Sequence, residues 1–139
     1  MIENSLSIIK PDAVERNIIG KIITMIEEEG LELIAQKMIH ISEKLAKEFY
    51  YEHKDRVFFK DLIKYMTSYP VIVQVIRGEN AISKYRELMG VTDPRKAKIN
   101  SIRNRFGLDI EANSVHGSEN LSSAQREISL FFSPEEIFM

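Results

Sequence analysis

The chain has 139 residues, and its 44% hydrophobic and 29% charged residues exclude a disordered protein. The absence of cysteine excludes disulfides and thiolate metal sites, and the formal net charge of −2 argues against a general nucleic-acid binder. No segment resembles a signal peptide or approaches the roughly 20 apolar residues of a membrane span. We therefore expect a single domain over residues 1–139, located in the cytoplasm and not associated with a membrane.

The first part of the sequence alternates strand, helix and strand. Residues 5–9 form a short apolar segment, which the following Lys-Pro pair ends because proline pushes its predecessor into extended geometry. Isoleucines then recur at the spacing of an amphipathic helix over residues 19–26, and Gly30 is placed to end this helix. Alternation resumes at residue 31 and predicts a strand to about Ile41.

The middle of the sequence predicts three helices and a buried strand. Ser42 is a good N-cap for the first helix, and hydrophobic residues at helical spacing over 59–66 predict the second. Residues 71–76 are almost continuously apolar, as expected of a strand that is buried on both faces. A further helix from about residue 80 to 89 ends at Gly90.

Periodicity fades from Val91 to about Asn113, and irregular segments of this length are usually functional or disordered. Residues 114–117 then predict a short strand. A last helix begins near Asn120 with Leu121 on its inner face, and Phe138 packs with the rest of an apolar tail. This order of elements predicts an α/β sandwich in which helices cover the sheet.

Common catalytic motifs are missing from the sequence. The glycines form neither G-x-x-x-x-G-K nor G-x-G-x-x-G, and the protein kinase signatures are absent. The three histidines have neither H-E-x-x-H nor close ligand spacing, which argues against a zinc site. A serine hydrolase built on Ser118 is a weak alternative because no G-x-S-x-G is present.

His116 is the strongest candidate for catalysis. Gly117 allows a ligand to approach the backbone closely, and Ser118 precedes a helix whose N-terminus attracts anions. Glu127 lies on that helix, from where it could orient the imidazole. A neutral imidazole can accept a phosphoryl group where cations neutralise the oxygens, and the segment 95–105 carries basic but no acidic residues. The alternatives are a structural histidine and a solvated basic loop.

Phe58 supports a nucleotide ligand. The adjacent Phe59 belongs to a helical stripe, which leaves Phe58 free to stack on a flat ring. Stacking tolerates every base because each base has a π-face. The alternative is that Phe58 packs into the core.

Several blocks of the sequence resemble motifs of the nucleoside diphosphate kinase family. In chain order they are S-I-I-K-P-D-A-V at 7–14, F-Y-x-x-H-K-D-R-x-F-F at 49–59, R-E-L-M-G at 86–90, T-D-P at 92–94 and N-S-V-H-G-S at 113–118. They follow the order and spacing of the family and cover nearly the whole chain. The resemblance implies a ferredoxin-like α/β (α+β) sandwich with a four-stranded antiparallel sheet, assembled into a homo-oligomer, either a tetramer or a hexamer.

The resemblance also implies a ping-pong reaction. ATP or another nucleoside triphosphate phosphorylates His116, and a nucleoside diphosphate collects the phosphoryl group, with Mg²⁺ as a cofactor held through the nucleotide phosphates. The family's catalytic residues correspond to His116, Lys10, Glu127, Ser118 and Tyr50. Its nucleotide-binding residues correspond to Lys10 (γ-phosphate and ribose 3′-OH), Phe58, Ile110 and Leu62 (base), Arg86 and Thr92 (β-phosphate), Arg103 (transferred group) and Asn113 (ribose).

One segment departs from the family pattern. Where the family reads P-G-T-I-R-G-D-F, residues 99–106 read I-N-S-I-R-N-R-F, which keeps Arg103 but replaces the flanking glycines and the aspartate. Asparagine tolerates left-handed backbone, so Asn100 and Asn104 are expected to preserve the path of the loop.

Two other functions fit the same sequence. The first is a catalytically silent nucleotide-binding or regulatory protein, against which the intact His116, Lys10 and Arg103 count. The second is a nucleic-acid-binding role for the basic segment 95–105, which the acidic net charge disfavours.

Overall fold

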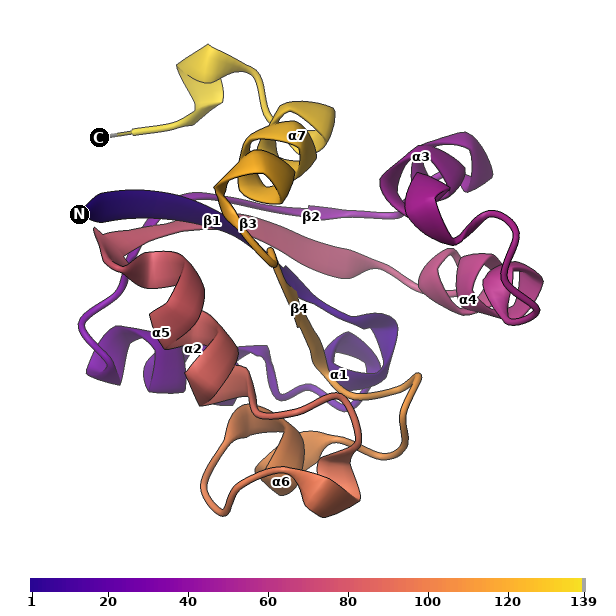
Figure 1. Cartoon of the computed structure of the whole chain (residues 1–139), viewed down its shortest axis with the longest axis horizontal. Coiled ribbons are helices and arrows are strands. Elements are labelled where there is room, and N and C mark those ends of the chain that lie inside the picture. The colour runs from indigo at the N-terminus through magenta and orange to yellow at the C-terminus, as the bar shows by residue number, and fades with distance from the viewer. Residues whose placement is uncertain (139) are drawn as a thin grey trace.

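The computed structural model describes residues 1–138, and its centre is a four-stranded antiparallel sheet (Figure 1). The strands are β1 (Ile2–Ile9), β2 (Glu32–Ile39), β3 (Val71–Glu79) and β4 (Val115–Gly117). Their spatial order is β2-β3-β1-β4, and β1 pairs with both β3 and β4. The ferredoxin-like arrangement predicted above is thereby confirmed.

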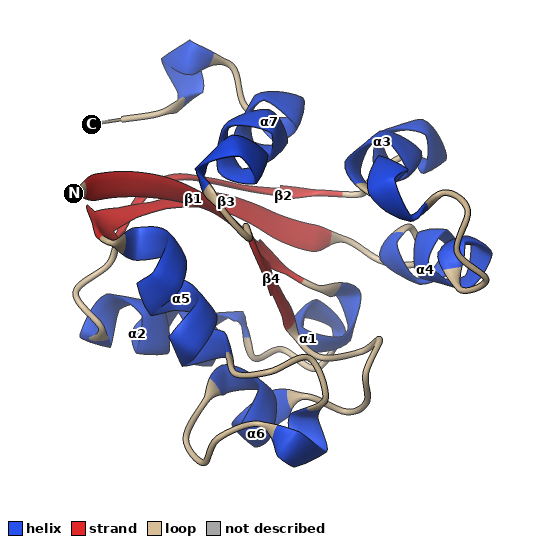
Figure 2. Ribbon diagram, in the orientation of Figure 1, coloured by secondary structure: helices blue, strands red, loops and turns tan. Residues whose placement is uncertain are grey.

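Helices cover both faces of this sheet (Figure 2). They are α1 (Pro11–Glu15), α2 (Ile19–Glu28), α3 (Glu43–Phe49), α4 (Phe59–Met66), α5 (Ala81–Met89), α6 (Ile102–Phe106) and α7 (Leu121–Phe131). Hydrophobic residues of α3, α4 and α7 form one core cluster with the sheet, and those of α1, α2, α5 and α6 form another. In the described part of the chain, no helix has the length and apolarity needed to span a bilayer.

The strand β3 shows why the sheet carries two cores. Val71, Val73 and Val75 belong to the cluster with α3, α4 and α7, whereas Ile72 and Ile76 belong to the opposite cluster. Successive side chains of a strand point to opposite faces, so a continuous apolar run is what burial on both faces requires. The expectation drawn from this run is confirmed.

The helix ends predicted from the sequence are also present. Ser42 accepts a hydrogen bond from the backbone N–H of Leu45 at 3.1 Å and so caps α3. Gly30 and Gly90 follow α2 and α5 with φ of +80° and +85°, values that favour glycine. These caps set where the chain turns back toward the sheet.

Some expectations about the C-terminal half were wrong. Leu121 is 43% exposed and does not lie on the inner face of α7, where Ala124 and Phe131 are buried instead. Phe138 is 74% exposed rather than packed. The segment 91–113 is not wholly irregular, because it contains α6 and a short 3-10 turn at Pro94–Lys96.

The altered loop uses its two asparagines differently. Asn100 has φ of +70°, the left-handed conformation for which it is suited. Asn104 lies inside α6, so it needs no such freedom. Its side chain instead accepts a hydrogen bond from the backbone N–H of Asn100 at 3.3 Å, which ties the helix to the turn before it.

Candidate active site

A cavity of about 370 Å³ opens between α3 and α7 on one side and α5 and α6 on the other, with β4 at its base. Its walls combine both signs of charge with a few aromatic and apolar side chains. The residues that line it are Phe49, Tyr50, Glu52, His53, Arg86, Met89, Gly90, Val91, Thr92, Arg103, His116, Gly117, Glu119, Ser123, Arg126 and Glu127.

His116 lies on β4 opposite Ile8 of β1, and its imidazole is held from two sides. On one side, its Nε2 lies 2.9 Å from Oε1 of Glu127 on α7. On the other, the ring of Phe49 meets the imidazole edge-on, with 4.9 Å between the ring centroids. The imidazole therefore has a fixed orientation at the base of the cavity.

Ser118 supports Glu127 rather than His116 directly. Its hydroxyl donates to the same Oε1 of Glu127 at 2.8 Å and accepts from the backbone N–H of Leu6 at 3.1 Å. Burial of Glu127 opposes its ionisation, but the hydrogen bonds from His116 and Ser118 outweigh burial and hold the pKa of Glu127 below its ordinary value. Glu127 is therefore ionised at neutral pH and can only accept hydrogen bonds.

The ionised Glu127 fixes the tautomer of His116. Because a carboxylate has no proton to give, Nε2 of His116 must be the donor in the 2.9 Å contact. In the neutral imidazole the other nitrogen, Nδ1, then keeps its lone pair. The sequence alone could not show which ring nitrogen keeps its lone pair.

Lys10 and Asn113 form a buried pair beside the cavity. Lys10 Nζ donates to Oδ1 of Asn113 at 2.8 Å, and the two residues are 7% and 1% exposed. The amide of Asn113 in turn donates to the carbonyls of Thr92 and Ile110. Burial, with a contribution from the nearby charge of Arg103, lowers the pKa of Lys10 to about 8.

Arg103 enters the cavity from α6. Its Nη1 donates to the carbonyl of Gly90 at 3.0 Å and its Nη2 donates to the carbonyl of Val115 at 2.8 Å. Its Nε is buried and, within residues 1–138, has no hydrogen-bond partner. A guanidinium that two backbone carbonyls hold at the wall of a cavity is suited to binding an anionic oxygen.

The structure places the remaining predicted residues in two groups. Tyr50, Arg86 and Thr92 line the cavity with His116. Phe58 and Ile110 lie outside its walls and are 47% and 57% exposed. Leu62 is half-buried and packs against the core of α3, α4 and α7.

Two features of the site were missed in the sequence. Phe49 begins one of the family blocks but was given no role there, although it contacts the imidazole of His116. Gly117 was explained by ligand approach, but a Cβ there would lie 2.7 Å from the ring of Tyr85 and 2.8 Å from Met89. The packing of α5 against β4 therefore requires this glycine.

Comparisons with known proteins identify similar chains over this whole length. A family model described as nucleoside diphosphate kinase matches residues 3–137. A nucleoside diphosphate kinase from a Nitratiruptor species is 56% identical over 135 residues, 97% of this chain and 98% of its own. One from Coxiella burnetii is 53% identical over 137 residues, 99% of each chain.

Solved structures give the same result. The Aquifex aeolicus nucleoside diphosphate kinase has a TM-score of 0.96 at 44% identity and covers 99% of both chains. A halophilic nucleoside diphosphate kinase from Halobacterium salinarum, solved in complex with CDP, has a TM-score of 0.97 at 40% identity. That alignment covers 100% of this chain and 93% of the other.

Proposed function

This chain belongs to the nucleoside diphosphate kinase family, and from the geometry of its cavity we propose how each of its residues contributes to phosphoryl transfer. The enzyme moves the γ-phosphate of a nucleoside triphosphate to a nucleoside diphosphate through a phosphohistidine at His116. The observation that carries the proposal is the contact between His116 and Glu127 at the base of the cavity.

The lone pair of His116 Nδ1 is the nucleophile. It forms a bond to the γ-phosphorus, while the bond from that phosphorus to the bridging oxygen breaks and releases a nucleoside diphosphate. In the second half-reaction a β-phosphate oxygen of another nucleoside diphosphate attacks the phosphorus and frees Nδ1. Glu127, held by Ser118, stabilises the positive charge that the imidazole develops while its nitrogen is bonded to phosphorus.

Cations receive the phosphate oxygens. Arg86 and Arg103 line the cavity, and Lys10 is held beside it by Asn113. Phosphoryl transfer depends mainly on positioning and charge stabilisation, which these side chains supply without further chemistry. Tyr50, whose burial raises its pKa and keeps its hydroxyl neutral, completes the wall over the phosphates.

The rest of the nucleotide extends outward from the cavity. Thr92 accompanies Arg86 at the β-phosphate, and Asn113 with Lys10 meets the ribose. The exposed faces of Phe58 and Ile110 hold the base between them, with Leu62 near it. The Halobacterium salinarum relative is solved in complex with CDP, which supports nucleotide binding by this chain.

Mg²⁺ would be the cofactor, held through the phosphates of the nucleotide rather than by the protein. The residues present fit this arrangement, because Arg86 and Arg103 line the cavity and Lys10 is held beside it by Asn113, so cations are placed to receive the phosphates that would hold the ion. The ion would neutralise phosphate charge. The protein would contribute the cations and the orientation of the phosphates.

The chain is a single domain over residues 1–139 and assembles with copies of itself in the cytoplasm, where its nucleotide substrates are used. The strand β2 is at an edge of the sheet, where the N–H of Phe138 donates to the carbonyl of Ile34, and its 57% exposed Met38 supports self-association. Sedimentation equilibrium distinguishes a tetramer from a hexamer.

The decisive experiment is chemical. Incubation with a γ-labelled nucleoside triphosphate should place acid-labile phosphate on the protein and release nucleoside diphosphate in equal amount. Phosphorus NMR of the labelled protein should locate the phosphate on Nδ1 of His116. Phosphate on Nε2 would contradict the proposed role of Glu127, and acid-stable phosphate on Ser118 would contradict the nucleophile itself.

Activity should fall as the pH rises through about 8, the pKa of Lys10. Below that pH Lys10 is a cation that attracts phosphate oxygens, and above it the side chain is neutral. Because kcat/KM reports the free enzyme, its alkaline limb should show an apparent pKa near 8 in a pH series. A flat profile to pH 10 would contradict this assignment.

The same titration should not unfold the protein. The pKa of Lys10 is lower in the folded chain than its ordinary value of 10.5, so the unfolded chain binds more protons between the two values. This group therefore favours folding increasingly as the pH rises across that window. A melting temperature that stays level while kcat/KM falls would separate lost charge from lost structure.

The enzyme should tolerate every base. Phe58 and Ile110 offer exposed apolar surface to the ring, and stacking discriminates weakly between bases. Adenine, guanine and pyrimidine nucleotides should differ by no more than about 100-fold in kcat/KM. A preference of about 10⁴ for one base would require a polar group that reads the base edge.

A further inference from the structure

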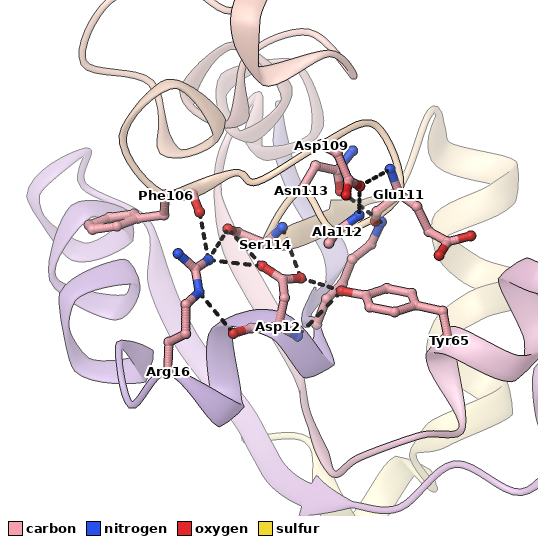
Figure 3. A network of polar contacts seen from close by, with 10 residues as sticks. Asp12, Arg16, Tyr65, Phe106, Asp109, Glu111, Ala112, Asn113 and Ser114 are labelled. Carbon is pink, nitrogen blue, oxygen red and sulfur yellow. Dashed lines mark hydrogen bonds and ion pairs between the residues drawn. The ribbon is translucent and has the colours of Figure 1, made fainter.

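A second polar network lies behind the cavity, where α1 meets the loop before β4 (Figure 3). Its centre is the carboxylate of Asp12, which is 7% exposed. This carboxylate accepts hydrogen bonds from the hydroxyl of Tyr65, from Arg16 Nη2 at 3.0 Å, and from both the backbone N–H and the hydroxyl of Ser114 at 3.3 Å. Arg16 also donates to the carbonyl of Phe106 at 2.6 Å.

The network holds Ser114 in a conformation that serine rarely adopts. Ser114 has φ of +75°, in the left-handed region that disfavours side chains with a Cβ. Its N–H is bonded to Asp12, and its carbonyl accepts from the backbone N–H of Lys10 at 2.8 Å. Such strain persists only where the surroundings over-determine it, and it is concentrated at functional sites.

Ser114 joins the segment 91–113 to β4, so it lies where this segment leaves the sheet. The turn at 109–112 is braced internally, because the carboxylate of Asp109 accepts from the N–H groups of Glu111 and Ala112 at 2.9 and 2.7 Å. The turn is therefore internally fixed, and the backbone of Ser114 sets the direction in which residues 109–113 lie relative to β4. Asn113, which immediately precedes Ser114, then meets Nζ of Lys10 at 2.8 Å.

Asp12 thus acts on the Lys10–Asn113 pair from both ends. On one side it follows Lys10 closely at the start of α1, and on the other it fixes Ser114 next to Asn113. The carboxylate of Asp12 is buried and already bonded to three other side chains, so we assign it no contact of its own with the nucleotide. Any effect on nucleotide recognition must pass through the residues that it holds.

We propose that Asp12 is a positioning residue that, by fixing the left-handed Ser114, places the Lys10–Asn113 pair where it recognises the ribose 3′-OH of the nucleotide. This inference rests on the proposed roles of Lys10 and Asn113. A positioning role differs from a purely structural one in its consequence. Loss of Asp12 should lower kcat/KM more for a nucleotide with a 3′-OH than for one without it.

The test compares kcat/KM for a nucleoside triphosphate and for its 3′-deoxy analogue, with the same base. The wild-type enzyme should prefer the nucleotide that carries the 3′-OH. Asn113→Ala should remove most of this preference, and Asp12→Asn should reduce it by about tenfold through the misplaced pair. Glu15→Gln, which removes the same charge from an exposed position of α1, should keep the wild-type ratio.

The outcomes distinguish failure of the ribose assignment from failure of the positioning role of Asp12. If Asn113→Ala keeps the full preference, the ribose assignment in the proposed function fails. If Asn113→Ala loses the preference but Asp12→Asn keeps it, or lowers kcat/KM for both nucleotides equally, the positioning role of Asp12 is overturned.

A milder variant covers the case in which Asp12→Asn does not fold. Tyr65→Phe leaves the carboxylate and its contacts with Ser114 in place but removes two hydrogen bonds, one that the hydroxyl donates to the carboxylate and one that it accepts from the backbone N–H of Asp12. It should shift the 3′-OH preference in the same direction by a smaller factor. An unchanged ratio in folded Tyr65→Phe, checked by circular dichroism, would then overturn the inference.

Discussion

Replacing His116 with alanine should abolish the phosphoenzyme and lower turnover by roughly four orders of magnitude or more. The two half-reactions share one covalent intermediate, so its loss removes both together. The cations and the cavity would remain, but alanine has no lone pair to attack phosphorus. Steady-state turnover and acid-labile labelled phosphate should disappear in parallel.

His53 provides a matched control because it lines the same cavity. Its Nδ1 is buried and, in the described part of the chain, has no hydrogen-bond partner, whereas His116 is oriented by Glu127. His53→Ala should therefore keep the phosphoenzyme and lose less than about tenfold in turnover, since it removes no reacting group. Persistent activity in His116→Ala, or equal losses in both variants, would contradict the assignment of the nucleophile.

The fold could be predicted where the pattern of hydrophobic residues is regular. The almost continuous apolar run over Val71–Ile76 and the helical spacing of α2 and α4 indicate which faces are buried, because burial of those faces is what stabilises each element. The helix α1 was not predicted, because its five residues are too few to show a helical stripe. The exposure of Phe138 was missed because hydrophobicity alone does not say whether a covering element exists.

The sequence indicated which residues form the site but only part of their geometry. The pairing of His116 with Glu127 was anticipated, because a helix that follows a short strand packs back over it. The resemblance to the family indicated Lys10 and Asn113, but not the 2.8 Å contact between them. That contact depends on Ser114, and nothing in local sequence predicts a left-handed serine.

The nitrogen that we propose as the nucleophile follows from a contact that the sequence does not show. The imidazole uses Nε2 for its hydrogen bond to Glu127, which leaves Nδ1 free. Ser118 helps to hold this contact. Its hydroxyl donates to Glu127 and accepts from the backbone of β1. These two hydrogen bonds hold the carboxylate of Glu127 beside the imidazole.

Lys10→Gln should lower kcat/KM by about 10² to 10³, because it removes a cation held beside the transferred phosphoryl group. Glutamine still offers an N–H donor toward Oδ1 of Asn113, so the loop should keep its anchor. The loss would then measure charge rather than loop position. Lys98→Gln, on the exposed part of the basic segment, should stay within about threefold of the wild-type enzyme because surface charges contribute little.

The pH profile makes this prediction specific. If Lys10 is the group that titrates at about pH 8, kcat/KM of Lys10→Gln should show no alkaline limb there, although its absolute value is low at every pH. Lys98→Gln should keep the limb. An alkaline limb that remains at the same pH in Lys10→Gln would assign the titration to another group. A loss in kcat/KM of less than about threefold would exclude Lys10 from the transfer step, because a cation at the transferred group contributes far more than that.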